Sequence, residues 1–275
     1  MTFPYAICNE TFDGWDHARS CEVAAKVGYK ALEVAPFTLA PLITQWDAKA
    51  RSDYRQLVES HGLEVIGLHW LLAKTQGFQV TSPDPLVRQK TAEYIGELAI
   101  ACQDLGGHLM VFGSPLQRKI PEGYTAAQAR EFFVDSLERI LPLLEKTEIS
   151  FLLEPLSSQE TDFLLTAEEA CSILDEFHHP LLGLHLDVKA MSSEEQSIPQ
   201  IIENSWRHLR HFHANDANRR GPGFGKVDFR PIFEALHKIH YPGWVSVEVF
   251  DYLPDPETIA RESLSYMRRC ETVPA

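Results

Sequence analysis

Short apolar runs recur along the chain and alternate with longer amphipathic segments. Each run holds four to seven residues and is partly β-branched, which is typical of a strand buried in a sheet. We predict strands at Tyr5–Cys8, Ala31–Val34, Glu64–His69, His108–Phe112, Ser150–Glu154, Leu181–Asp187, Leu209–His213 and Trp244–Val249.

The segments between these runs carry apolar residues at helical spacing. Thr166 precedes one of them and has Glu169 three residues later, a pattern that begins helices. We predict helices at 16–27, 47–61, 84–105, 124–147, 166–177, 198–206, 228–239 and 256–269.

Strands that alternate with helices predict a parallel sheet built from βα units. Eight such units favour closure into one α/β domain over residues 1–275, a single (β/α)8 TIM barrel. An open doubly wound sheet is the alternative, but no GxGxxG motif follows the first predicted strand. Two long segments, 70–83 and 214–227, follow strands and are expected at the mouth where barrel enzymes bind substrate.

The composition narrows the class of protein. Hydrophobic residues make up 44% of the chain, and the formal net charge is −14, which argues against a nucleic-acid partner. The sequence offers no signal peptide and no apolar run near ~18 residues, so we expect neither secretion nor a membrane partner. Five scattered cysteines without a CxxC pair are expected to be free thiols in a reducing cytoplasm.

Four charged or imidazole side chains stand at the ends of four successive predicted strands. They are Glu154, Asp187, His213 and Glu248. Because the carboxyl ends of barrel strands face one cavity, these side chains are expected to converge there. Three carboxylates and one imidazole suit one divalent metal ion, manganese, magnesium or cobalt, better than a closed zinc site. The plainer alternative is four independent strand-end residues that make caps or salt bridges.

A longer motif follows the predicted strand that ends at His213. The segment HANDANRRGPGFG, residues 213–225, resembles the corresponding segment of the sugar phosphate isomerase/epimerase superfamily, the xylose isomerase-like TIM barrels. The chain is most similar to its ketose 3-epimerases, which act on tagatose and psicose. The resemblance covers the whole chain as architecture, but its distinctive motifs lie between residues 150 and 250.

The resemblance implies roles for individual residues. In that family the Glu, Asp, His, Glu set binds one divalent metal, and the two Glu residues also act as acid and base. It therefore implies that Glu154 and Glu248 are catalytic, and that Arg219 and Glu160 bind substrate. It also implies a small sugar or hydroxy-carbonyl substrate and a homo-oligomer, a dimer or a tetramer.

The chain departs from the family at one position. The family has a substrate-contacting His three residues after the strand-six Asp, whereas this chain has Ala190. If the strand continued, Lys189 would point to the same side as Asp187 and place its ammonium near the substrate. His69, Trp70 and Glu33 also end or follow predicted strands, and we take them as further candidates for substrate binding.

The predicted chemistry is proton transfer α to a carbonyl. A metal-stabilised enediolate forms, and the two Glu residues carry protons on its opposite faces, which gives a sugar epimerase or isomerase. Other enolising reactions on the same scaffold remain open: hydroxypyruvate isomerisation, inosose or dehydroshikimate dehydration, and elimination on a 3-keto-sugar. An endonuclease IV-like nuclease is a further alternative, which the missing additional metal ligands disfavour. A non-catalytic carbohydrate-binding barrel is another, but it would not need the paired Glu residues.

Overall fold

The computed structural model describes residues 2–272 and confirms the predicted barrel. Each strand is parallel to the next, and the last strand pairs with the first, so the sheet closes. The strands are β1 (Tyr5–Cys8), β2 (Ala31–Val34), β3 (Glu64–Leu68), β4 (Leu109–Phe112), β5 (Ser150–Leu153), β6 (Leu182–Asp187), β7 (Leu209–Ala214) and β8 (Val245–Val247).

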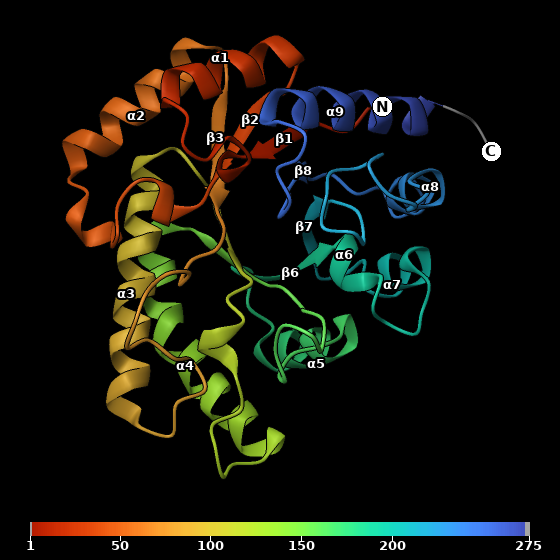
Figure 1. The fold of residues 1–275 in the computed structure, drawn as a ribbon. Coiled ribbons are helices and arrows are strands. Elements are labelled where there is room, and N and C mark those ends of the chain that lie inside the picture. Colours follow the sequence, from red (N-terminus) through yellow and green to blue (C-terminus); the bar gives the residue numbers. More distant parts are fainter. Residues whose placement is uncertain (1, 273–275) are drawn as a thin grey trace.

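Helices form a ring around the strands, and the last helix lies beside the first (Figure 1). The α-helices are α1 (His17–Val27), α2 (Ala48–Ser60), α3 (Pro85–Asp104), α4 (Ala126–Thr147), α5 (Ala167–Phe177), α6 (Val188–Met191), α7 (Ile198–Asn204), α8 (Arg230–Lys238) and α9 (Pro256–Thr272). Short 3-10 segments occur in the loops: η1 (Asn9–Phe12), η2 (Pro36–Thr38), η3 (Ile43–Gln45) and η4 (Leu116–Arg118).

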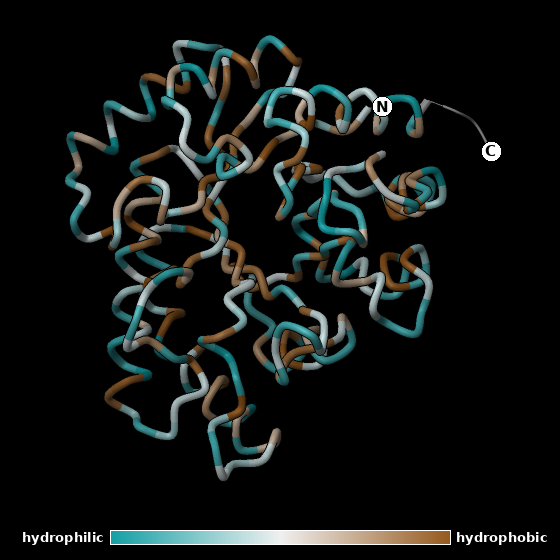
Figure 2. Tube along the Cα trace, viewed as in Figure 1, coloured by the Kyte–Doolittle hydropathy of each residue, from teal (hydrophilic) through white to brown (hydrophobic). Residues whose placement is uncertain are grey.

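The apolar core lies between the strands and the inward faces of these helices. Hydrophobic residues concentrate on the strands and on the inward helix faces, and hydrophilic residues lie outside (Figure 2). The strands are buried along nearly their whole length, because a parallel barrel is covered on both sides. Burial of this apolar surface is the main contribution to stability and fixes the strand ends relative to one another.

Most predicted element boundaries differ from the observed ones by one or two residues. Glu154 and Glu248 follow β5 and β8 instead of ending them, and His69 follows β3. These differences leave each side chain at the carboxyl edge of the barrel. Thr166 caps α5 as predicted, since its side chain accepts a hydrogen bond from the Glu169 backbone N–H.

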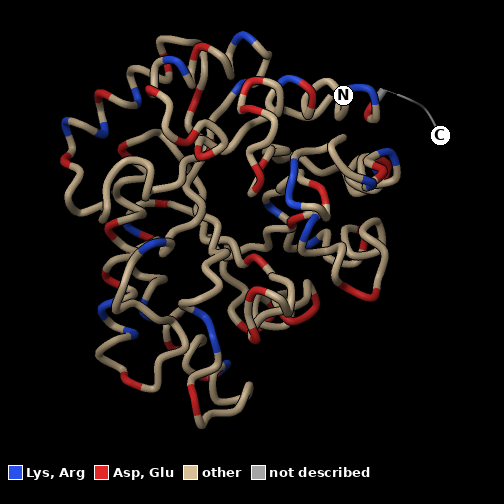
Figure 3. Tube along the Cα trace, in the orientation of Figure 1, with Lys and Arg blue, Asp and Glu red and all other residues tan. Residues whose placement is uncertain are grey.

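Charged residues of both signs are spread over the outer helices and loops (Figure 3). Within residues 2–272, every helix is too short or too polar to cross a bilayer.

Candidate functional site

The four predicted ligands come together at the carboxyl edge of the barrel. Each of Glu154, Asp187, His213 and Glu248 offers one nitrogen or oxygen atom, and these four atoms lie within 4.8 Å of one another. All four side chains are buried. The group could therefore hold one metal ion in a site shielded from bulk water.

Backbone and side-chain donors hold the carboxylates in place. Trp70 Nε1 donates a hydrogen bond of 2.6 Å to Glu248 Oε1. Asp187 accepts one bond of 2.7 Å from the Ala190 backbone N–H and another of 2.5 Å from Asn215 Nδ2. These bonds fix the orientation of the two carboxylates before any ligand binds.

The Glu154 carboxylate occupies space that is free because residue 113 is a glycine, which has no side chain. A Cβ at position 113 would lie 1.7 Å from Glu154 Oε2, so only Gly113 leaves room for this carboxylate. Arg118, which is fully buried, donates a hydrogen bond of 2.5 Å to the Glu154 backbone carbonyl and another to the Phe112 carbonyl. Gly113 and Arg118 thus position the end of β5 against the end of β4.

His213 lies between two carboxylates. Its Nδ1 is 3.2 Å from Glu248 Oε2, and its Nε2 is 3.0 Å from Glu33 Oε2. A second imidazole, His211, also reaches Glu33 at 2.8 Å. A carboxylate behind a ligating imidazole fixes which ring nitrogen carries the proton, so Glu33 is placed to orient His213.

The electrostatics of the cluster fit a divalent cation. Burial and the charges of Glu248 and Asp187 raise the pKa of Glu154 to about 8. Burial and the charge of Glu248 raise the pKa of Asp187 to about 6, although Lys189 opposes the change. These carboxylates therefore repel one another in a buried space, and a cation with oxygen and imidazole ligands would relieve that repulsion.

A cavity of about 270 Å³ opens beside the cluster. Both Glu154 and Glu248 line it. The predicted substrate contacts Trp70, Glu160, Lys189 and Arg219 line it as well. Its size suits one small molecule held against the two catalytic candidates.

Lys189 faces the cavity as predicted, but it lies on a helix and not on a continued strand. The strand does not continue past Asp187, since α6 begins at Val188 and the Asp187 side chain caps it. The expected alternation along a strand is therefore wrong. Lys189 Nζ still reaches the cavity, where it lies 2.6 Å from Glu160 Oε1.

Two other candidates lie beneath the cavity. Glu33 is fully buried and contacts His211 and His213, as described above. His69 Nε2 is 2.9 Å from Glu10 Oε2, and both side chains are buried. The structure therefore does not bring Glu33 and His69 to the cavity wall, where their predicted substrate contacts would be made.

Several residues of the cavity wall carry no clear signal in the sequence. Phe250 packs against Trp70, with ring centroids 5.8 Å apart, and Lys74 also lines the cavity. Both belong to loops after strands. Gly113 directly follows β4, and a glycine at a strand end was the one available hint of a close approach.

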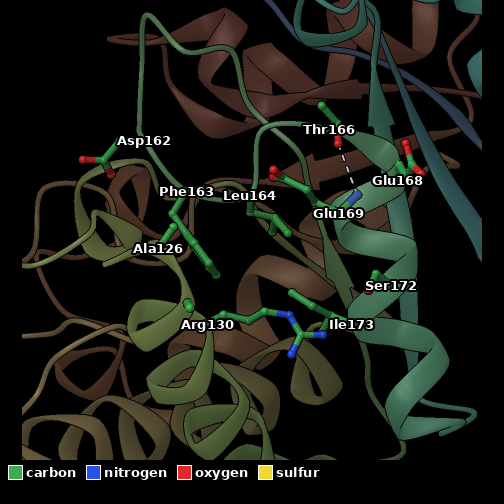
Figure 4. A pocket seen from close by; sticks show the side chains of 11 residues that line it. Ala126, Arg130, Asp162, Phe163, Leu164, Thr166, Glu168, Glu169, Ser172 and Ile173 are labelled. Atoms are coloured by element: carbon green, nitrogen blue, oxygen red, sulfur yellow. Dashed lines mark hydrogen bonds between the residues drawn. The ribbon is translucent and has the colours of Figure 1, made fainter. Parts of the chain in front are cut away.

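A second cavity, of about 530 Å³, lies between the starts of α4 and α5 (Figure 4). Arg130 of α4 and Ile173 of α5 point into it from opposite sides. The Arg130 guanidinium is paired with Glu176. This cavity contains none of the predicted site residues.

Comparison with known proteins agrees with this architecture. A family model described as xylose isomerase-like TIM barrel matches residues 21–270. A D-psicose 3-epimerase from Ruminiclostridium cellulolyticum is 28% identical over 243 residues, which cover 86% of this chain and 78% of that protein. A 3-dehydro-D-guloside 4-epimerase from Escherichia coli is 30% identical over 144 residues, 51% of this chain and 54% of that protein.

Solved structures support the same fold. The crystal structure of D-psicose 3-epimerase with D-tagatose, from Clostridium cellulolyticum, superposes with a TM-score of 0.85. The superposition covers 98% of this chain and all of that one, at 22% identity. At that identity the superposition establishes the fold alone.

Proposed function

The chain belongs to the xylose isomerase-like TIM barrel family, and from this premise we propose that it is a divalent-metal-dependent sugar epimerase or isomerase. The observation that carries the proposal is the position of Glu154 and Glu248. They follow β5 and β8, two strands that are not neighbours in the barrel, and both line the same cavity. A substrate between them would meet a carboxylate on each side.

The metal would be manganese, magnesium or cobalt, held by Glu154, Asp187, His213 and Glu248. When bound, such an ion stabilises negative charge that develops on the substrate oxygens. Asp187 and His213 hold fixed orientations through Asn215 and Glu33. Their role in the proposal is ligation alone.

Proton transfer is assigned to the two glutamates. One removes the proton from the carbon next to the carbonyl, and the other returns a proton to the opposite face, which inverts that carbon. If a single glutamate serves both steps, the product is the isomer with the carbonyl moved. Trp70 holds Glu248 through its hydrogen bond, and Glu160 and Arg219, which line the same cavity, are assigned to substrate binding.

Hydrogen–deuterium exchange tests the proposal directly. The manganese-loaded protein is incubated in heavy water with ketoses and small hydroxy-carbonyls, and NMR locates any deuterium on carbon. Measured at Mn²⁺ concentrations that saturate each variant, Glu154→Gln and Glu248→Gln should each lower the exchange rate by about 100-fold or more. Glu145→Gln, on the outer surface of α4, is the matched control and should exchange at the wild-type rate.

Two results would overturn the assignment. Wild-type exchange in either glutamine variant would show that the residue carries no proton. Exchange at no carbon of any compound would favour a binding protein instead.

A dehydratase or another lyase that uses the same base is the second candidate. Position 190 holds Ala, and the neighbouring Lys189 lines the cavity and is paired with Glu160. An ammonium group can stabilise a departing oxygen as well as bind a hydroxyl. The same NMR spectra would reveal a product that has lost water, which distinguishes this reaction from epimerisation.

A further inference from the structure

A third cavity, of about 450 Å³, adjoins the one beside the ligand cluster. Three residues line both spaces: Glu160, Lys189 and Arg219. The remaining wall of the outer space consists of four polar residues, Ser157, Gln159, Ser192 and Ser193, and of Ala217. We call this space the outer subsite. A ligand larger than a simple ketose can therefore extend past the shared residues without leaving the protein surface.

Arg219 is presented to this junction by an unusual backbone. Its φ is +73°, in the left-handed region that residues other than glycine rarely adopt. Its carbonyl accepts hydrogen bonds of 2.9 and 3.0 Å from the backbone N–H groups of Phe250 and Asp251. Such strain persists only where neighbouring structure holds it, and it is concentrated at functional sites.

The guanidinium of Arg219 has no carboxylate partner within ion-pair distance among the described residues. Its charged carbon lies 5.7 Å from the centroid of the Phe250 ring, and Lys189 Nζ lies 4.2 Å from the same centroid. One ring thus holds both cations at the boundary of the two cavities. The Arg219 side chain is exposed, so a ligand in solution can reach it.

Lys189 differs from Arg219 because Glu160 is already bound to it at 2.6 Å. Glu160 also accepts a bond of 2.8 Å from Ser157 Oγ, so the ion pair is tied to the wall of the outer subsite. Three cations, Lys74, Lys189 and Arg219, face four carboxylates here, those of Glu154, Glu160, Asp187 and Glu248. A divalent ion at the inner cluster would add two positive charges, so that the loaded site would carry a net charge of +1. The loaded site would thus be positive in a protein whose formal net charge is −14.

We propose that the outer subsite binds an anionic group of the substrate, a carboxylate or a phosphate, and that Arg219 and Lys189 are its ligands. The proposal rests on the proposed function, since the reacting carbons would lie in the inner cavity. Arg219 supplies planar paired donors that match either anion, and Lys189 supplies a point charge. The substrate class is therefore an acidic sugar or a sugar phosphate.

Binding measurements test this without any need for turnover. Isothermal titration of the magnesium-loaded protein compares D-fructose with D-fructuronate and D-fructose 6-phosphate, and D-tagatose with D-tagaturonate and D-tagatose 6-phosphate. At least one acidic compound should bind about tenfold more tightly than its neutral parent, the effect of one charge-assisted hydrogen bond. The uronates and the phosphates distinguish the two sources of negative charge.

Variants assign the effect to the named cations. R219M should abolish the preference for the acidic compound, and R219K should retain only part of it, because an ammonium keeps the charge but loses the paired donors. K189M should reduce the preference. This substitution also leaves Glu160 without its ion-pair partner, so the double variant K189M/E160Q removes that unpaired charge. The preference should stay reduced in the double variant, because the loss comes from the missing contact between Lys189 and the ligand. E160Q alone should strengthen it because Lys189 is released from its ion pair.

Lys90→Met is the matched control, because Lys90 also lies over an aromatic ring, Phe78, but lines neither cavity. It should keep the wild-type preference. Equal binding of neutral and acidic compounds, or a preference that survives in R219M, would overturn the proposal. If the protein catalyses deuterium exchange but shows no preference for acidic compounds, the proposed function stands and the anion-binding subsite is rejected. If it prefers acidic compounds but catalyses no exchange, the subsite stands and the proposed function is rejected.

Discussion

Glu33 lies behind His213 and has no access to the cavity, and this position predicts a change in metal affinity. Its carboxylate is 3.0 Å from His213 Nε2 and 2.8 Å from His211 Nε2. Glu33→Gln keeps the shape but removes the charge that orients the imidazole. We expect the affinity for Mn²⁺ to fall by about 10- to 100-fold, the usual effect of losing such a partner.

Titration with Mn²⁺, followed by the electron paramagnetic resonance signal of the free ion, measures this change. The control is Glu64→Gln, at the exposed start of β3, which should bind Mn²⁺ as the wild type does. Unchanged affinity in Glu33→Gln would mean that His213 does not need this carboxylate for ligation.

At the scale of secondary-structure elements, the approach of β4 to β5 controls the position of Glu154. Gly113→Ala would place a methyl group 1.7 Å from the present position of Glu154 Oε2, so the carboxylate must move. We expect the variant to fold but to lose Mn²⁺ affinity and exchange activity by about tenfold or more, because ligand displacements near 1 Å impair such sites.

Gly123→Ala provides the contrast. Its Cβ would meet no atom within 4 Å, but its φ of +82° disfavours alanine. It should lower the free energy of unfolding by about 1 kcal/mol and leave Mn²⁺ affinity intact. If Gly113→Ala bound Mn²⁺ normally, Glu154 would not be a required ligand.

The contact between α3 and α4 predicts a pH-dependent part of the stability. Asp135 of α4 accepts hydrogen bonds from Arg139, at 2.8 Å, and from Arg88 of α3, at 2.5 Å. Arg139 and then Arg88 hold the pKa of Asp135 below its ordinary value. In the unfolded chain the pKa of an aspartate is about 3.9, and in the folded protein that of Asp135 is lower. The ion pair therefore contributes its full stabilisation above a pH of about 3.9, and this contribution is lost as the pH falls through the pKa of the folded state.

Asp135→Asn should therefore lower the free energy of unfolding at pH 7 by about 1 kcal/mol, as expected of a partly exposed ion pair. The difference from wild type should narrow as the pH is lowered from 5 towards 3. Urea unfolding followed by circular dichroism measures both. A difference that is constant over this range would assign the effect to packing and not to charge.

At the scale of the whole molecule, the hydrophobic pattern was sufficient to predict the barrel. Each strand is buried on both faces, so each appears as an apolar run bounded by polar residues. Closure brings the carboxyl ends of all strands to one edge, which is why Glu154, Asp187, His213 and Glu248 were predicted to meet. These features depend only on element order and on the geometry that the fold imposes.

The remaining features depend on backbone details that the pattern does not encode. The pairing of β2 with β3 shifts register between Leu32 and Glu33, and Glu33 is the residue that was predicted to bind substrate but is buried against His213. Lys189 reaches the cavity because Asp187 caps α6 immediately after β6. Arg219 reaches it through a left-handed backbone conformation. Register shifts, immediate caps and strained loop residues are set by tertiary contacts, so local sequence alone did not predict them.

The ligand cluster also makes a prediction about the stability of the whole protein. An ion that binds only the folded chain stabilises it by about 2.7 kcal/mol at 100 times its dissociation constant. For a domain of this size that corresponds to a rise in Tm of about 5–10 °C. Differential scanning calorimetry should show this shift: the protein in excess chelator should have a lower Tm than the protein with Mn²⁺.

Asp187→Asn tests whether the rise in Tm comes from the ligand cluster. Asparagine can still cap α6, but the cluster loses one of its negatively charged ligands. This variant should lose most of the Mn²⁺-dependent stabilisation. Its Tm in chelator should be somewhat lower than that of the wild type, because the new amide NH2 would face the Asn215 NH2 that the carboxylate now accepts from. The control is Asp175→Asn, an exposed residue paired with His208, which should keep the full shift. Equal stabilisation of Asp187→Asn and the wild type by Mn²⁺ would place the ion elsewhere in the molecule.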